Sequence, residues 1–132
     1  MEFISDPSSQ QLAELQKELS NERGAGIVDI HGNMVSKYYA LSENEKLIGV
    51  SSVSYLGESC VEIYKIYISP SRRRERLGRK LLDQTIRCLA KNGIAEVCIE
   101  STEESRLFWE SVKSDYEVKE YFHNKFCILI GS

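Results

Sequence analysis

The sequence predicts a single domain of the α/β class, in its α+β form, built on a mixed and mostly antiparallel sheet. Three consecutive strand-like segments, 35–41, 46–55 and 60–69, are joined by short turns, which is typical of an antiparallel meander. A helical segment, 77–91, and a further strand, 95–100, follow directly. A strand, a helix and a strand in this order form a right-handed crossover, so 60–69 and 95–100 are expected to pair in parallel.

The N-terminal part of the chain predicts a short strand and an amphipathic helix. Residues 1–4 form the strand. Asp6 is expected as the N-cap of the helix, with Pro7 in the first turn, where no helix hydrogen bond is lost. Residues 23–33 contain three glycines and are interpreted as a loop. The helix is expected to reach about residue 20, and its buried stripe consists of Leu12, Leu15 and Leu19.

The C-terminal part predicts one more helix and a hairpin. Ser101 and Glu104 have the spacing of a capping box and predict a helix that ends near Lys113. Residues 116–121 and 125–130 predict the two strands of the hairpin. The second strand is too apolar for an exposed edge, so it is expected inside the sheet or at a dimer contact.

Positive charge is concentrated in one short segment. The chain carries a formal net charge of −3, whereas residues 71–80 carry six basic residues and one acidic residue, which leaves the remainder at −8. This asymmetry indicates a local anion site on an acidic body. It argues against nucleic-acid binding, which needs an extended basic face.

The cysteines and histidines do not predict a metal site. His31 and His123 have no cysteine or histidine neighbour at ligand spacing. Without a signal peptide or an apolar run long enough to cross a membrane, the protein is expected in the cytoplasm and away from membranes. The cysteines stand far apart in the sequence and are interpreted as small buried side chains in a reducing compartment: Cys60, Cys88, Cys98 and Cys127.

The junction between residues 60–69 and 77–91 is a candidate anion site. An apolar strand stops at Ser69 and Pro70, a basic loop follows, and a helix begins near Leu77. The first backbone N–H groups of such a helix point to one place, where the helix dipole also favours negative charge. A phosphate cradle fits this arrangement, and so does a solvated helix start whose arginines keep the protein soluble.

The same junction resembles the acetyl-CoA-binding segment of the GNAT superfamily of N-acetyltransferases. In that family a strand, and often a proline, precede Arg/Gln-x-x-Gly-x-Gly/Ala at the start of a helix. Arg73 matches the first position of this motif and Gly78 the last, whereas Arg76 and Arg74 stand where glycine is common. The order of elements resembles the family more weakly over residues 1–130. The matching segment is Ile66-Tyr67-Ile68-Ser69-Pro70-x-x-Arg73-x-x-Arg76-x-Gly78-x-x-Leu81-Leu82.

The resemblance implies one GNAT-like domain over residues 1–132, with helices on both faces of the sheet and the parallel strand pair forming the CoA cleft. It implies an acyl-CoA N-acyltransferase that moves the acetyl group of its co-substrate acetyl-CoA directly to a primary amine, without a metal. The amine partner is a small molecule, a polyamine or a protein, and a homodimer is compatible with this function. A module that binds a CoA ester or a partner with little or no turnover is the alternative, suggested by Arg76 and Trp109.

The resemblance assigns the cofactor to the strand end, the loop and the helix start. The backbone N–H groups of residues 74–79 are expected to bind the diphosphate. Arginine side chains are expected to reach it from the flanks, because a planar guanidinium donates two hydrogen bonds at once. The assigned residues are Ile66, Ile68, Arg73, Arg74, Arg76, Leu77, Gly78 and Arg79.

Glu62 is the candidate general base. It precedes Arg73 by eleven residues, the offset at which some family members carry a catalytic glutamate. Strict alternation along the strand places it on one face with Tyr64, Ile66 and Ile68. A glutamate that faces water at the start of a strand is the alternative interpretation.

The usual general acid of the family is missing. Many members carry a tyrosine in a pattern resembling N-x-x-A-x-x-F-Y-E-K-x-G-F, and here Trp109 stands at that tyrosine. An indole N–H does not serve as a proton-transferring acid. Tyr64 or Tyr116 is expected to replace the tyrosine, or the thiolate leaves without an acid. Trp109 is equally interpretable as a core residue. The counterpart segment is Thr102-x-x-Ser105-x-x-Phe108-Trp109-Glu110-Ser111.

Overall fold

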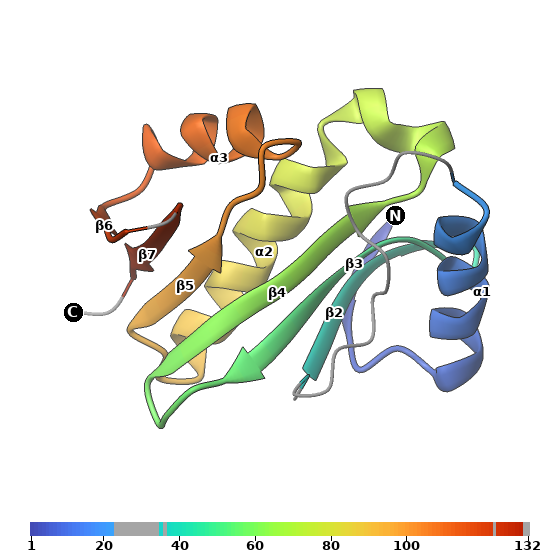
Figure 1. Ribbon diagram of the computed structural model, residues 1–132. Helices are drawn as coiled ribbons and strands as arrows, with labels where there is room; N and C mark the ends of the chain where they lie inside the picture. The colour runs from blue at the N-terminus through green and yellow to red at the C-terminus, as the bar shows by residue number, and fades with distance from the viewer. Residues whose placement is uncertain (23–34, 36, 123, 131–132) are drawn as a thin grey trace.

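The computed structural model describes residues 1–22, 35, 37–122 and 124–130, except for the side chain of Arg74. Within these residues, one seven-stranded sheet carries three α-helices and a short 3₁₀ helix, η1 (Figure 1). The loop expected over residues 23–33 lies outside the described residues. The elements are β1 (Glu2–Ser5), α1 (Ser9–Ser20), β2 (Lys37–Glu43), β3 (Lys46–Tyr55), β4 (Cys60–Ile68), η1 (Pro70–Glu75), α2 (Leu77–Lys91), β5 (Glu96–Glu100), α3 (Arg106–Lys113), β6 (Val118–Glu120) and β7 (Lys125–Leu129).

The strand order confirms the predicted mixed sheet. In the described part of the chain the order is β1-β2-β3-β4-β5-β7-β6, and every neighbouring pair is antiparallel except β4 and β5. β7 lies between β5 and β6, so the apolar C-terminal strand is inside the sheet, as predicted. α2 connects the two parallel strands and passes along one face of the sheet (Figure 1).

Helices cover both faces of the sheet, as the resemblance implied. On one face, α2 and α3 bury apolar side chains such as Leu82 and Val112 against β5 and β7. On the other face, α1 packs its predicted leucine stripe against Ala40, Val50 and Tyr67 of β2, β3 and β4 (Figure 1). Among the helices of the described residues, none has the length and apolar character to cross a membrane.

β4 contains a bulge near its middle. Val53 of β3 pairs with Ile63 of β4, whereas the preceding residue, Ser52, pairs with Lys65. Tyr64 is therefore an extra residue on β4 with no partner of its own in this register. Such a bulge bends a strand and exchanges the faces to which the following side chains point.

The bulge overturns one prediction about the site. Ile63 packs in the core beneath α2, and beyond the bulge Ile66 and Ile68 pack on that same side. Tyr67 instead packs against α1. Strict alternation along β4 would have placed Tyr67 on the side of Ile63, and Ile66 and Ile68 on the opposite side, because it does not account for an inserted residue. The prediction that one face carries Glu62, Tyr64, Ile66 and Ile68 is therefore wrong.

The N-cap of the first helix lies two residues later than predicted. Ser8 caps α1, with its Oγ accepting the N–H of Gln11 at 3.1 Å while Gln11 Oε1 accepts the N–H of Ser8 at 2.9 Å. This reciprocal pair is a capping box with glutamine at the third position. Asp6 lies outside the helix with a φ of 54° and forms an ion pair of 3.8 Å with Lys37.

The third helix also begins later than predicted, because the expected capping box does not form. Thr102 and Ser105 instead bond to each other in a turn, with Thr102 Oγ1 2.9 Å from Ser105 Oγ and the N–H of Thr102 donating to the same Oγ at 3.0 Å. α3 starts at Arg106, and Glu104 stays in the preceding turn.

Candidate active site

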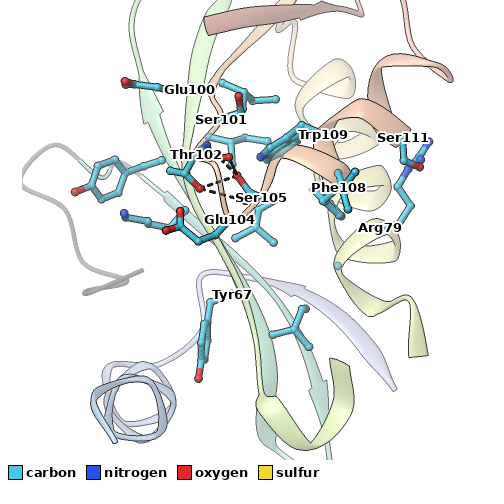
Figure 2. A pocket seen from close by; sticks show the side chains of 18 of the residues that line it. Tyr67, Arg79, Glu100, Ser101, Thr102, Glu104, Ser105, Phe108, Trp109 and Ser111 are labelled. Atoms are coloured by element: carbon cyan, nitrogen blue, oxygen red, sulfur yellow. Dashed lines mark hydrogen bonds between the residues drawn. The ribbon is translucent and has the colours of Figure 1, made fainter. Parts of the chain in front are cut away.

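β4 and β5 separate after a short paired stretch. Their register runs from Cys60 opposite Glu96 to Glu62 opposite Cys98, although β4 continues to Ile68. A cavity of about 1300 Å³ opens where the strands diverge. Its walls come from β4, the start of α2, the loop after β5, and α3, whose side chains gather around the cavity in Figure 2. Ligands of such sheets bind beyond the carboxyl ends of parallel strands, which is where this cavity lies.

The start of α2 presents backbone N–H donors at this cavity. Arg76 joins η1 to α2 in a left-handed conformation, with φ 58° and ψ 28°, and no described side chain caps the helix. The N–H of Lys80 donates to the carbonyl of Arg76 at 3.2 Å. The N–H groups of Leu77, Gly78 and Arg79 precede that bond and are the groups that a helix start offers to an anion.

Arg73 is already bound by a carboxylate. Its guanidinium pairs with Glu22 beyond the end of α1, with Nη2 2.8 Å from Oε2, and its Nε donates to the carbonyl of Ile68 at 3.1 Å. Tyr67 Oη donates to the same carboxylate at 2.7 Å. The hydrogen bond from Arg73 is the largest cause that lowers the pKa of Glu22, and burial raises the pKa of Tyr67.

Arg79 is held in the same way on α2. Its Nε lies 3.0 Å from Asp83 Oδ1 and its Nη2 lies 2.9 Å from Asp115 Oδ2. Tyr116 Oη donates to Asp83 Oδ1 at 2.6 Å, and burial, followed by this bond, raises the pKa of Tyr116 to about 12. Tyr116 is not part of the cavity wall. Its hydroxyl is therefore placed as a structural donor to Asp83.

Arg76 differs from these two arginines. It is exposed and lines the cavity, and among the described residues no carboxylate lies within ion-pair distance of its guanidinium. Gly78 lines the cavity beside Phe108, where an added Cβ would lie 3.4 Å from the ring. Leu77 is instead a core residue, packed with Leu81 beneath the sheet.

Glu62 and Tyr64 lie together on the wall formed by β4. Both line the large cavity, Glu62 half-buried and Tyr64 with 44% of its surface exposed at the bulge. Glu62 also lines a second cavity of about 340 Å³ at β5 and β7. Three carboxylates, Glu62, Glu96 and Glu100, and one ammonium, Lys125, line that second cavity, so it is acidic.

The structure brings most of the predicted site residues to one place. Leu77 and Tyr116 do not line the cavity, and the side chain of Arg74 lies outside the described residues. The predicted residues on the cavity wall are Glu62, Tyr64, Ile66, Ile68, Arg73, Arg76, Gly78 and Arg79.

Trp109 lies where α3 meets both the cavity and the core. It is only 6% exposed, and its ring makes edge-on contacts with Phe108 at 4.8 Å and Phe126 at 5.8 Å between centroids. Figure 2 shows Trp109 and Phe108 reaching from α3 toward the cavity, close to Ser105. This burial supports the interpretation of Trp109 as a packing residue.

The family model of the acetyltransferase (GNAT) family matches residues 5–113. The chain belongs to the GNAT family of acetyltransferases. The predicted family is thus confirmed, and with it the assignment to the acyl-CoA N-acyltransferases. No curated protein matches the sequence significantly.

Solved structures of other GNAT proteins share the fold at low sequence identity. GCN5 from Tetrahymena matches with a TM-score of 0.75 and 12% identity, covering 98% of this chain and 96% of that one. The ribosomal-protein-S18-alanine N-acetyltransferase from Escherichia coli matches with a TM-score of 0.73 and 16% identity, covering 99% and 96%. PaiA N-acetyltransferase from Thermoplasma acidophilum in complex with coenzyme A matches with a TM-score of 0.69 and 13% identity, covering 97% and 98%.

Arg76, where this chain departs from the GNAT motif, also has an unusual backbone conformation. The residue has a positive φ of 58°, a region in which glycine is unstrained and a side chain costs roughly 1–2 kcal/mol. A glycine at this position would therefore suit the turn into α2. Here the strained backbone carries to the cavity a guanidinium that no carboxylate of the described residues pairs with.

Sequence reasoning missed the acidic partners of the site. Glu22 lies 51 positions before Arg73, and Asp83 lies 33 positions before Tyr116. Neither carboxylate belongs to the motif, and no local pattern connects such distant positions. For Glu22 the only signal was the excess of acidic residues outside residues 71–80, whereas the i,i+4 spacing of Arg79 and Asp83 on the predicted helix could have indicated that pair.

Proposed function

We propose that this GNAT protein transfers the acetyl group of acetyl-CoA directly to a primary amine. The observation that carries the proposal is that an uncapped, basic helix start and Glu62 lie on the walls of one cavity. The helix start suits a diphosphate, and Glu62 suits an ammonium that must lose a proton. Direct transfer needs both groups within reach of one thioester.

The cofactor is held mainly by the start of α2 in this proposal. The N–H groups of Gly78 and Arg79 bind the diphosphate together with the guanidinium of Arg76, which has no ion-pair partner among the described residues. Arg73 already shares its charge with a carboxylate, so it adds less attraction than its sequence position implies. The cavity wall on β4 receives the pantetheine arm, because its backbone has no β5 partner beyond residue 62.

The acceptor amine approaches Glu62 from the second cavity. Glu62, Ile99 and Glu100 line both cavities, so the two spaces meet at the proposed base. The acidic lining attracts a cationic amine and holds it near the carboxylate that removes its proton. A small amine, a polyamine and a protein amine all fit this charge.

Tyr64 is the proposed donor to the departing thiolate. It lines the cavity with Glu62, whereas Tyr116 is occupied by Asp83 and lies outside the wall. Trp109, at the position of the family's tyrosine, packs in the core. If Tyr64 does not act, the thiolate leaves without a proton donor.

Acetyl-CoA binding and turnover test the proposal in two steps. A ligand that binds only the folded state raises the melting temperature by mass action, so acetyl-CoA is expected to do so. Acetylated product is then measured by mass spectrometry over a panel of small amines, polyamines and lysine peptides, which avoids interference from the protein's own thiols. No shift at millimolar acetyl-CoA would refute the proposed cofactor. Binding without any product would favour the non-catalytic module instead.

A further inference from the structure

Three cysteines that are distant in the sequence meet on one face of the sheet. Cys60 lies on β4, Cys98 on β5 and Cys127 on β7, and Cys98 is paired with Cys127 across the two antiparallel strands. The sulfur of Cys98 lies 3.7 Å from that of Cys60 and 2.6 Å from that of Cys127. All three are free thiols. The sequence could not indicate this, because the topology of the sheet creates the cluster.

Cys60 and Cys98 have the spacing of two zinc ligands. With Zn–S bonds of about 2.3 Å, sulfurs 3.7 Å apart subtend an angle of about 107° at the metal, close to that of a tetrahedron. Glu96 stands opposite Cys60 in the register of β4 and β5. Its carboxylate and the two sulfurs all lie within 4.8 Å of one another. Because Glu96 is exposed, rotation of its side chain can bring an oxygen to the same point.

Cys127 is not arranged as a ligand of the same ion. Sulfurs 2.6 Å apart would subtend only about 69° at a metal with Zn–S bonds of about 2.3 Å, which is too narrow for a tetrahedron. Cys127 is also buried, and Cys98 separates it from Cys60 along the row of strands. Cys127 therefore contacts the site without being one of its ligands.

The surroundings of the thiols favour a cation. The second cavity reaches Cys98 and Glu96, and its lining adds the carboxylates of Glu62 and Glu100 against the single ammonium of Lys125. A cavity that reaches two of the three ligands, Cys98 and Glu96, leaves a coordination position for water, as in open zinc sites. Thiolates together with a carboxylate select a borderline-soft ion such as Zn²⁺ over Mg²⁺ or Ca²⁺.

We propose that Cys60, Cys98 and Glu96 form a site for a thiophilic divalent cation of the Zn²⁺ class, with water as the fourth ligand. Binding forms two metal–sulfur bonds and one metal–oxygen bond, and each coordinating thiol releases its proton to solvent. None of the three ligands lines the large cavity, although Cys98 and Glu96 line the second cavity through which the amine is proposed to approach. Metal binding to the site needs neither acetyl-CoA nor an amine, so it is tested separately from the proposed acetyl transfer.

Cobalt titration of the full chain tests this site. The protein is reduced and stripped of metal, its four thiols are confirmed by alkylation and mass spectrometry, and Co²⁺ is added as a chromophoric probe. One Co²⁺ per chain is expected, with near-ultraviolet thiolate-to-cobalt absorption and visible bands of tetrahedral intensity. Zn²⁺ is expected to displace it. A reduced chain that shows no saturable absorption would overturn the proposal.

Variants identify the ligands. Cys60→Ser and Cys98→Ser are each expected to weaken Co²⁺ binding by more than about 100-fold, beyond the loss typical of outer partners, and Glu96→Gln by a smaller factor. Cys88→Ser is the matched control, because Cys88 lies on α2, outside the cluster. Metal-free melting curves confirm that each variant folds. Equal binding by Cys60→Ser and Cys88→Ser would contradict the assignment.

Discussion

Arg73 and Glu22 join the basic loop to the segment that follows α1. The guanidinium Nη2 lies 2.8 Å from Glu22 Oε2, and Tyr67 Oη donates to the same oxygen at 2.7 Å. The Glu22 carboxylate thus accepts hydrogen bonds from a guanidinium of η1 and from a phenol of β4. These two elements of the cavity wall are thereby tied to the segment that follows α1.

Glu22 is expected to make stability depend on pH in the acid range. Its pKa is lower in the folded chain than the usual 4.5, so the pair stabilises the fold above that value and is lost as pH falls through the folded pKa. The difference in the free energy of unfolding between the native chain and Glu22→Gln should therefore be largest near neutral pH and shrink below about pH 4.5.

Denaturant unfolding at several pH values measures this difference. Glu14→Gln is the control, because Glu14 is exposed on α1 and none of the described residues forms an ion pair with it. If the difference for Glu22→Gln stays constant from neutral pH to below pH 4.5, folding does not change the pKa of the Glu22 carboxylate.

Arg76→Gly is expected to stabilise the fold. The left-handed backbone at φ 58° costs a side chain roughly 1–2 kcal/mol, and the added flexibility of glycine in the unfolded chain offsets part of the gain. A net increase of roughly 0.5–1 kcal/mol in the free energy of unfolding should remain. Lys80→Gly, inside α2, should instead lose about 1 kcal/mol. The same sign for both variants would contradict the strain at Arg76.

Gly78 gives a test of the proposed diphosphate site. Gly78→Ala should fold and still bind acetyl-CoA, because its Cβ would make an ordinary contact 3.4 Å from Phe108. Gly78→Glu should abolish the rise in melting temperature with acetyl-CoA, because it places bulk and negative charge at the helix start. Equal increases in melting temperature with acetyl-CoA for the two variants would show that the start of α2 does not bind the diphosphate.

The fold was readable from the sequence because its signals are local. The apolar run that ends at Ser69 predicted β4, the leucine spacing predicted α1, and the order of strand, helix and strand predicted the parallel pair. The caps failed where two local patterns competed. Ser8 with Gln11 displaced Asp6 at the start of α1.

The site was readable only in part, because side-chain pairing is not local. The bulge at Tyr64 exchanges the faces of β4 beyond it, and it is visible only in the register of β4 with β3. Glu22, the partner of Arg73, and Asp115, one of the two partners of Arg79, come from distant positions in the chain, whereas Asp83 lies one helical turn after Arg79. The contact of Cys60 with Cys98 follows from the order and the register of β4 and β5.

Glu62→Gln is expected to lower the turnover number by about 100- to 10,000-fold, the range typical of a lost general base. Acetyl-CoA binding should change little, because the substitution is isosteric and the helix start is untouched. Turnover is measured at saturating acetyl-CoA. Glu58→Gln, in the exposed turn before β4 and outside both cavities, is the control. Full activity in Glu62→Gln would make Glu62 a structural residue.

Trp109 decides how far this chain follows the mechanism of its relatives. Its ring fills the space between Phe108 and Phe126, and its burial leaves 6% of its surface exposed. Two roles give opposite results on substitution. A packing residue loses stability when it is made smaller, whereas a position that has lost a proton donor gains rate when a phenol returns.

Trp109→Tyr is expected to cost on the order of 1–3 kcal/mol in the free energy of unfolding and to leave the turnover number unchanged or lower. The reason is that the smaller ring gives up buried contact with Phe126, while its hydroxyl enters a largely apolar setting. Trp109→Phe changes the packing similarly without a hydroxyl, so the pair isolates the effect of the phenol. Stability is measured by denaturant unfolding and rate by single-turnover acetyl transfer. A Tyr variant faster than both the native and the Phe chain would show that a general acid is missing and that Trp109 stands in its place.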